Sequence, residues 1–200
     1  MSDKKKYLAA DAIKIAKELV EELRPFTIET PEAMKPHWPH SHLLAVAGSL
    51  RRRKSEVGDI EILYVPQVVA EMLDMFTVSQ IDSLHKRADQ LLASKVLAQR
   101  PNVKGAFTWG PKNKLAIHVA SGIPVDLFAT TADNWWVSLV IRTGSKETNL
   151  KLTMGAQKQG ARLNAYGSGV TWSDGTTTPA TSEEHVFEMC GVPFLPPHKR

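Results

Sequence analysis

The sequence predicts an α+β fold, with helices and short strands in one folded chain. Residues 7–24 carry apolar side chains every three to four positions, as one face of an amphipathic helix does. Residues 42–47, 60–65 and 124–128 are short apolar segments with β-branched residues, which is typical of buried strands. The chain has 200 residues, of which 42% are hydrophobic, so it can bury a core as one domain or as one domain with a small satellite.

The first half of the chain begins with that helix, which Pro25 ends. Residues 27–41 contain Pro31, Pro36 and Pro39 among polar residues, which predicts an exposed connector without an element of its own. After the strands at 42–47 and 60–65, a 3.6-residue rhythm over residues 68–100 predicts two helices with a break near 77–79.

The sequence predicts mainly strands in the middle of the chain. Residues 106–109 and 115–119 flank a Gly-Pro-Lys-Asn turn and predict a hairpin. Residues 124–128 predict another short strand. Residues 134–142 are apolar enough for a buried helix or a buried strand, and their periodicity does not decide between the two.

The C-terminal part begins with a helix, because Ser145 is a good N-cap for a segment that runs to Gln159. Residues 163–172 predict one strand of a pair that includes a Gly/Thr-rich turn. Residues 182–190 end in a short helix that Gly191 stops.

Composition excludes several classes of protein. Cys190 is the single cysteine, so there is no internal disulfide framework and no cysteine-based zinc site. No apolar run approaches the ~20 residues of a membrane span, and no secretion signal follows Met1, so we expect a cytoplasmic protein with no membrane partner. The formal net charge of +4 favours a polyanionic partner without requiring one.

The segment after residue 47 contains a candidate site for phosphate and metal ions. Gly48 and Ser49 form a small turn that suits a phosphate group, and a basic cluster follows them. Asp59 and Glu61 stand two positions apart on a strand, so their side chains project from one face and can hold divalent cations. Asp126 lies between apolar neighbours and needs a partner there. Together the three carboxylates suit two metal ions that clamp a phosphoryl transfer.

These motifs resemble a known family. Residues 48–49, a basic pair, residues 58–61 and the distant residues 125–128 resemble the palm of the nucleotidyltransferase superfamily. Residues 142–149, Arg-Thr-Gly-Ser-Lys-Glu-Thr-Asn, are similar to the thumb-entry motif of family X DNA polymerases, the polymerase beta group, and residues 183–200 resemble the end of that thumb.

The resemblance implies a palm over residues 1–140, a mixed sheet with flanking helices and the N-terminal helix, and a small α/β thumb over residues 141–200. It implies two Mg²⁺ ions, for which Mn²⁺ can substitute, held by Asp59, Glu61 and Asp126. Asp126 would bind the catalytic metal and take the proton of a primer 3′-hydroxyl.

The resemblance also implies a nucleotide site. Its residues are Gly48, Ser49, Arg52, Gly58, Thr143, Gly144 and Asn149. The first three would hold the β- and γ-phosphates with Gly58 nearby, the backbone of Thr143 and Gly144 would lie against the sugar, and Asn149 would lie against the base. Arg52 is chosen from its basic cluster by register alone.

The chain departs from the family pattern in places. Ile141 and Arg142 stand where many members have an aromatic pair beside the sugar, and Pro124 stands where some members have a basic residue. The 200 residues leave no room for the lyase and helix-hairpin-helix domains that grip the 5′ side of a gap.

The implied activity is that of a DNA-directed DNA polymerase that fills short gaps in repair. Its partners would be gapped or primer-template DNA and a nucleoside triphosphate, and we expect a monomer. One alternative is a nucleotidyltransferase that acts on RNA, a small molecule or a protein, because the same palm serves those reactions. Another is a non-catalytic nucleic-acid-binding protein.

Two further groups have plainer explanations. His37, His40 and His42 lie in a proline-rich loop without paired cysteines, which favours a solvated loop over a zinc site. Trp135 and Trp136 adjoin an apolar run, which favours burial over a platform for stacking bases.

Overall fold

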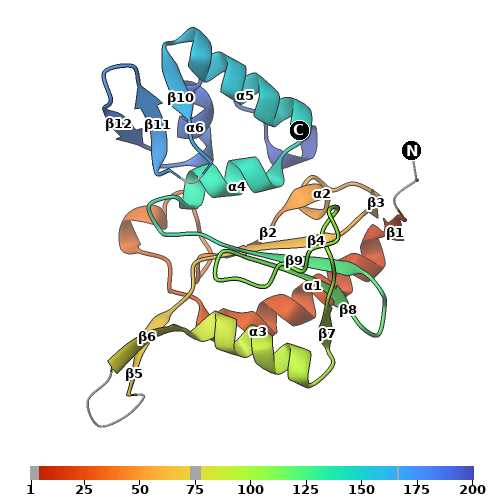
Figure 1. Ribbon diagram of the computed structural model, residues 1–200. Coiled ribbons are helices and arrows are strands. Elements are labelled where there is room, and N and C mark those ends of the chain that lie inside the picture. Colours follow the sequence, from red (N-terminus) through yellow and green to blue (C-terminus); the bar gives the residue numbers. More distant parts are fainter. Residues whose placement is uncertain (1–4, 73–77, 166) are drawn as a thin grey trace.

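The computed structural model describes residues 5–72, 78–165 and 167–200. Its centre is a mixed sheet, with one parallel pair, β4 and β9, and antiparallel pairs elsewhere. In spatial order its strands are β2 (Leu44–Val46), β4 (Ile60–Tyr64), β9 (Pro124–Ala129), β8 (Asn113–His118) and β7 (Leu97–Gln99). Figure 1 shows this sheet in the lower part of the molecule. The α+β class with a mixed sheet and flanking helices is confirmed.

One face of the sheet is covered by two helices, α1 (Ala9–Leu23) and α3 (Ser83–Ala93), which lie below it in Figure 1. The predicted helix over residues 7–24 is therefore confirmed as α1. Ile60 and Ile62 of β4 belong to the core cluster under this face, as the period of two along a strand predicts.

The opposite face packs against α4 (Trp135–Thr143), which lies above the sheet in Figure 1. Leu63 and Phe128 belong to this second core cluster, together with Trp135 and Trp136, which are both buried. The sequence left residues 134–142 open between helix and strand. A helix that is apolar on nearly every side needs burial on nearly every side, and α4 obtains it between the sheet and the C-terminal elements.

The C-terminal elements form a small lobe on α4. They are α5 (Lys146–Lys158), β10 (Ala161–Leu163), β11 (Gly169–Trp172), β12 (Thr177–Pro179), α6 (Glu183–Met189) and the 3-10 helix η3 (Pro197–Lys199). Ser145 caps α5 by accepting a hydrogen bond from the Thr148 N–H at 3.4 Å, as predicted. Strands β10, β11 and β12 form an antiparallel sheet, so residues 163–172 hold parts of two strands rather than one. No helix in the described ranges is long and apolar enough to cross a membrane.

The connector before β2 is more ordered than predicted. It contains the 3-10 helices η1 (Arg24–Phe26) and η2 (Glu32–Met34). Trp38 is buried and packs edge-on against Trp135, with ring centroids 5.0 Å apart. The expectation of a wholly exposed connector is therefore wrong, because one large aromatic side chain in a polar segment anchors that segment to the core.

Two further short strands, β1 (Tyr7–Leu8) and β3 (Glu56–Val57), pair with each other antiparallel. They join the start of α1 to the loop that precedes β4. The sequence placed Tyr7 and Leu8 in the helix, whereas the structure begins the helix at Ala9.

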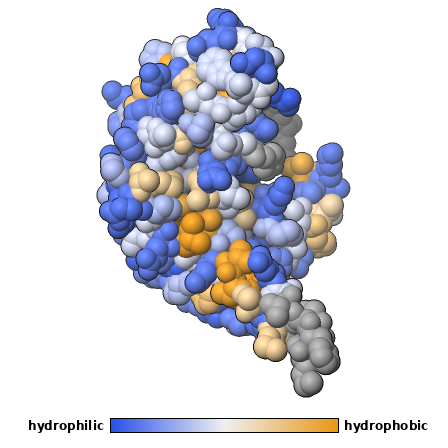
Figure 2. Space-filling view, turned by 90° about the vertical axis from the view of Figure 1, so that its left-hand side faces the viewer, coloured by the Kyte–Doolittle hydropathy of each residue, from blue (hydrophilic) through white to orange (hydrophobic). Residues whose placement is uncertain are grey.

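The prediction of two helices over residues 68–100 is wrong. Strands β5 (Val68–Met72) and β6 (Val78–Asp82) form a hairpin, and of the described residues in this segment α3 alone is helical. The hairpin projects from the body in Figure 1, and in the described residues it pairs with no third strand. Its successive residues therefore do not alternate between core and solvent. Val68 and Met72 are exposed, and apolar surface appears near the lower end of the face in Figure 2. Part of the predicted break, residue 77, lies outside the described residues.

The predicted hairpin over residues 106–119 is half right. β8 forms its second strand. The first segment makes only isolated bridges, Pro101 with Phe107 and Trp109 with Lys114, so it is a loop at the edge of the sheet.

Candidate active site

The two central strands of the sheet bring Glu61 and Asp126 side by side. In the parallel pair β4–β9, Glu61 is the direct partner of Asp126. Asp126 is in turn opposite Leu115 on β8, and the Leu115 carbonyl accepts a hydrogen bond from the N–H of Arg100, just after β7. Residues in one row across a sheet project from the same face, so one row of side chains runs from Glu61 through Asp126 to Arg100.

Asp59, the third predicted carboxylate, lies just before β4, two positions from Glu61. Burial and then the negative charge of Asp59 raise the pKa of Glu61 to about 7, with a smaller contribution from Asp126. Burial also raises the pKa of Asp126, while the charge of Arg100 opposes that rise. The three acids therefore share one electrostatic environment, in which negative charge is costly without cations.

The donor set fits a hard divalent cation. Glu61 and Asp126 on neighbouring strands, with Asp59 just before β4, offer the carboxylate oxygens that Mg²⁺ prefers. Within the described ranges, however, no three or more His, Cys, Asp and Glu side chains are gathered as a metal cluster. The Arg100 Nη2 lies 2.5 Å from the Asp126 Oδ1, so the charge of the Asp126 carboxylate is paired with an arginine.

Gly48 and Ser49 begin the short helix α2 (Gly48–Arg51) directly beside Glu61. Gly48 has φ = +60°, and a Cβ at this position would overlap the Glu61 carboxylate, so the close approach requires glycine. Ser49 Oγ is buried and has no hydrogen-bond partner among the residues that the structure describes. The predicted phosphate turn and the predicted metal ligands are therefore adjacent. Gly58 is half-buried, and open space surrounds the position of an added Cβ.

The end of α4 supplies the other wall. Arg52 Nη1 donates a hydrogen bond to the carbonyl of Thr143, and the Arg52 guanidinium approaches Gly144. The peptide between Gly144 and Ser145 is cis. Asn149 on α5 donates a hydrogen bond from Nδ2 to the Ile141 carbonyl at 2.9 Å. The structure thus brings Thr143 and Gly144 to Arg52, and it ties Asn149 to the end of the same helix.

The adjacent Arg51 has a different environment. Its Nη1 donates to Thr143 Oγ1 at 2.7 Å, and it forms an ion pair with Glu183 at 2.7 Å. Arg200 also pairs with Glu183 at 3.1 Å. Arg51 therefore joins α2 to α6 and to the Thr143 side chain, whereas Arg52 contacts the Thr143 carbonyl and approaches Gly144.

Several polar atoms around the row have no protein partner. Eight buried side-chain nitrogen or oxygen atoms lack a hydrogen bond in the described part of the chain. Three of them belong to residues in the row or next to it, Ser49 Oγ, Arg52 Nε and Arg100 Nε, and a fourth, Asn149 Oδ1, lies on α5. Buried polar groups in folded proteins are usually satisfied, so this concentration indicates a place prepared for a polar ligand.

Sequence reasoning did not single out Arg100, and it named Arg142 and Glu183 only within the thumb motifs, without a charged contact for either. The Arg142 guanidinium lies 3.6 Å from the centroid of the Phe128 ring and lowers the pKa of Glu61 and of Asp126. The sequence feature that could have indicated a nearby cation was Asp126, an acidic residue between apolar neighbours. A carboxylate among apolar residues requires a cation, although the sequence does not say which one.

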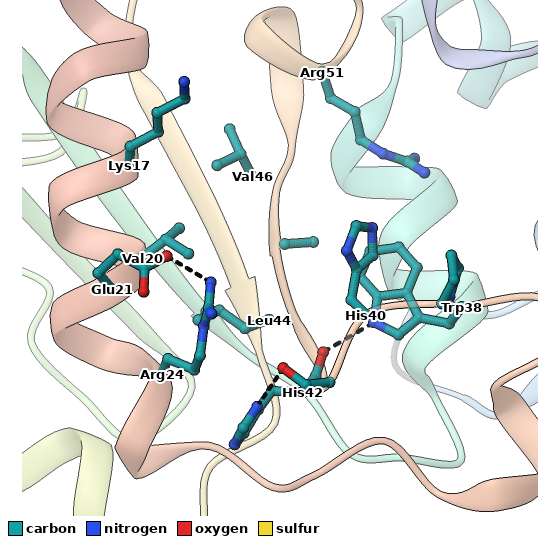
Figure 3. Close-up of a pocket in the computed structure, with 13 residues that line it drawn as sticks. Lys17, Val20, Glu21, Arg24, Trp38, His40, His42, Leu44, Val46 and Arg51 are labelled. Carbon is teal, nitrogen blue, oxygen red and sulfur yellow. Dashed lines mark hydrogen bonds and ion pairs between the residues drawn. The ribbon is translucent and has the colours of Figure 1, made fainter.

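The three histidines of the connector do not form a site with other metal ligands in the described residues. A cavity of about 570 Å³ lies beside His40 and His42, between α1, the connector and β2 (Figure 3). His40 packs edge-on against Trp38 with ring centroids 4.5 Å apart, and the His42 ring contacts the Ser41 hydroxyl. Lys17 and Arg24 of α1 line this cavity, and Arg51 at the end of α2 lines it as well, whereas Glu61, Asp126 and Arg100 do not.

The raised pKa of Glu61 predicts a pH dependence of stability. Between pH 4.5 and about 7 the folded chain keeps a proton on Glu61 that the unfolded chain has lost, so this residue makes the folded state less stable as the pH rises through that range. We expect E61Q to reduce this loss. Thermal unfolding in EDTA at pH 5 and pH 7.5 measures it, with E18Q on the exposed face of α1 as control. Equal pH dependence in E61Q and the wild type would contradict the assignment.

The arrangement is similar to that of known proteins. The family model for the DNA polymerase beta thumb matches residues 138–200. The DNA polymerase/3'-5' exonuclease PolX of Bacillus subtilis (strain 168) is 27% identical over 190 residues, which cover 94% of this chain and 27% of that protein. The chain thus spans about a quarter of the length of this curated relative.

A solved structure shares the fold. It is Leishmania infantum polymerase beta, described as a ternary P/T complex, and it matches with a TM-score of 0.71 and 19% sequence identity. The match covers 98% of this chain and 77% of that chain. The likeness therefore extends over both the sheet with its helices and the C-terminal elements.

Proposed function

We propose, on the premise that this chain is a family X DNA polymerase-like protein, that it adds a nucleoside monophosphate to the 3′-hydroxyl of a DNA primer. The substrate would be a deoxynucleoside triphosphate, and pyrophosphate would leave. The observation that carries this proposal is the direct pairing of Glu61 with Asp126 beside the Gly48–Ser49 turn, where the buried Ser49 Oγ has no hydrogen-bond partner among the described residues.

The carboxylates would hold two Mg²⁺ ions, with Mn²⁺ as a substitute. Asp59 and Glu61 would bind both ions, and Asp126 would bind the one nearer the primer. Bound Mg²⁺ would neutralise charge on the phosphates and lower the pKa of the primer hydroxyl. Asp126 would then accept the hydroxyl proton, a role that suits a carboxylate in a partly buried site. No covalent intermediate with the chain is required, because the reaction depends on positioning and charge neutralisation.

The nucleotide would lie between α2 and the end of α4. Ser49 Oγ and Arg52 would bind the β- and γ-phosphates, where Gly48 allows close approach. The Thr143–Gly144 backbone would lie along the sugar and Asn149 against the base, with Gly58 nearby. We propose a palm over residues 1–140 and a thumb over residues 141–200, and the thumb model's match to residues 138–200 supports this division.

The DNA partner would be a primer-template or a short gap, and we propose short-gap filling in repair by a monomer. The net charge of +4 supports contact with phosphates. A nucleotidyltransferase with RNA, a small molecule or a protein as acceptor remains the alternative, because its chemistry uses the same residues.

Primer extension tests the proposal. The purified chain is given a labelled primer on gapped, recessed and single-stranded DNA, with each nucleotide offered singly and with Mg²⁺ or Mn²⁺. Incorporation of the complementary nucleotide alone supports templated synthesis, and incorporation without regard to template supports terminal transfer. Transfer to RNA or protein acceptors, with none to DNA, would replace the proposal with its alternative. No transfer to any acceptor would favour a non-catalytic nucleic-acid-binding protein.

A further inference from the structure

Arg100 reaches Asp126 from a strand two places away. It follows β7, whereas Asp126 lies on β9, and β8 runs between them. Neighbouring strands are about 4.8 Å apart, so the arginine side chain extends across roughly 10 Å of sheet to bring Nη2 to the Asp126 Oδ1. Their separation is 2.5 Å, and the Leu115 side chain lies in the same row between them.

This arginine replaces a cation that β9 does not supply. The residues two positions before and after Asp126 on the same strand face are Pro124 and Phe128, and neither carries a charge. Arg142 lies over the Phe128 ring, and its charge lowers the pKa of Asp126 less than the charge of Arg100 does. Arg100 is therefore the direct counter-ion of Asp126, whose side chain is 11% exposed.

The other nitrogens of Arg100 are weakly engaged. Its Nε is buried without a hydrogen-bond partner, and its Nη1 makes only a long contact of 3.5 Å with the carbonyl of Pro101. The strong contact of the guanidinium in the described structure is therefore with the carboxylate, and the side chain does not serve mainly to hold its own loop. Its backbone N–H performs that role by bonding to Leu115.

We propose that Arg100 is a positioning residue for Asp126. By holding Oδ1, it fixes the orientation of the carboxylate and leaves Oδ2 as the oxygen presented to a cation and to the reacting hydroxyl. The catalytic part of this inference rests on the proposed function, whereas the pairing itself does not.

A double-mutant cycle in EDTA tests the pairing without reference to activity. We expect R100M to lower the Tm by roughly 5 °C or more, because it leaves a buried carboxylate without its counter-ion. In the D126N background, R100M should have a much smaller effect, because the charge that needed compensation is gone. R162M, on an exposed arginine of β10, is the matched control and should change the Tm little in either background.

Kinetics test the positioning role. R100M should lower kcat for nucleotide incorporation by about 10- to 100-fold, because a misdirected carboxylate reacts poorly. The nucleotide KM should change less than about twofold, since Arg100 is not among the proposed phosphate ligands. Added guanidinium should restore part of kcat in R100A but not in R100A/D126N. A merely structural role would show no such rescue.

The outcomes separate the two proposals. Additive Tm changes in the cycle overturn the role of Arg100 whether or not the wild type incorporates nucleotides. A rise in KM with unchanged kcat also overturns it, because it would make Arg100 a substrate ligand instead. A coupled cycle together with a wild type that is inactive on every acceptor assigns the failure to the proposed function, and it leaves Arg100 as the established counter-ion of Asp126.

Discussion

D126N is expected to lower nucleotide incorporation by about 10³-fold, because it removes at once a metal ligand and the proposed acceptor of the primer proton. The asparagine side chain has the same shape and can still accept a hydrogen bond from Arg100 at Oδ1, so the sheet should remain intact. The measurement is single-turnover extension on gapped DNA with Mg²⁺, combined with thermal unfolding of the same preparation.

D133N provides the matched control for this prediction. Asp133 is exposed in the turn before α4, where an amide should change neither rate nor stability appreciably. Loss of a general base usually lowers a rate by about 10²- to 10⁴-fold. A folded D126N protein that keeps roughly a tenth or more of the wild-type rate would therefore contradict the assignment of Asp126.

E183A is expected to destabilise the protein by about 3–5 kcal/mol, because it leaves two arginines without their shared acid. Glu183 accepts hydrogen bonds from Arg51 on α2 and from Arg200 near the chain end, and the Arg200 side chain is fully buried. Burial alone would raise the pKa of Glu183. The hydrogen bonds and charges of Arg51 and Arg200 together outweigh burial and hold this pKa below its usual value.

The lowered pKa gives this contribution a direction with pH. The folded chain binds the Glu183 proton less readily than the unfolded chain, so the stabilisation is present above the ordinary glutamate pKa and is lost as the pH falls through the folded value. Urea unfolding at pH 7 and at acidic pH should therefore show the largest cost of E183A at pH 7.

E184A is the control for E183A. Both glutamates lie in the first turn of α6, so both interact with the helix dipole, but Glu184 is exposed. We expect E184A to cost less than about 1 kcal/mol. Equal costs for the two variants would show that the helix end, rather than the ion pair with Arg51 and Arg200, accounts for the effect.

The carboxylate strands could be predicted from the sequence because they follow a local rule. A strand alternates its faces, so Ile60 and Ile62 had to lie opposite Glu61, and the structure agrees. The pairing of Glu61 with Asp126 depends on the register between strands far apart in the chain, which no local pattern contains. The contact of Arg100 with Asp126 is harder still to predict, because strand β8 lies between the two residues.

The errors in the fold have a related cause. The hairpin of β5 and β6 packs on no larger sheet, so burial imposes no alternation on residues 68–72 and a helical spacing appeared by coincidence. Trp38 shows the opposite case. Its neighbours are prolines and histidines, as in a loop, and only the tertiary contact with Trp135 and Trp136 makes this loop part of the core.

The core cluster above the sheet has a consequence for how the chain unfolds. It contains Leu63 and Phe128 from the sheet, Trp38 from the connector, and Leu152 and Val186 from the C-terminal elements. Because these side chains bury one another, neither half can expose its share of the cluster without exposing the share of the other. We therefore expect the proposed palm and the proposed thumb to unfold as one cooperative unit, and loss of the C-terminal helices should reduce the protection of amide hydrogens in the sheet from exchange with solvent.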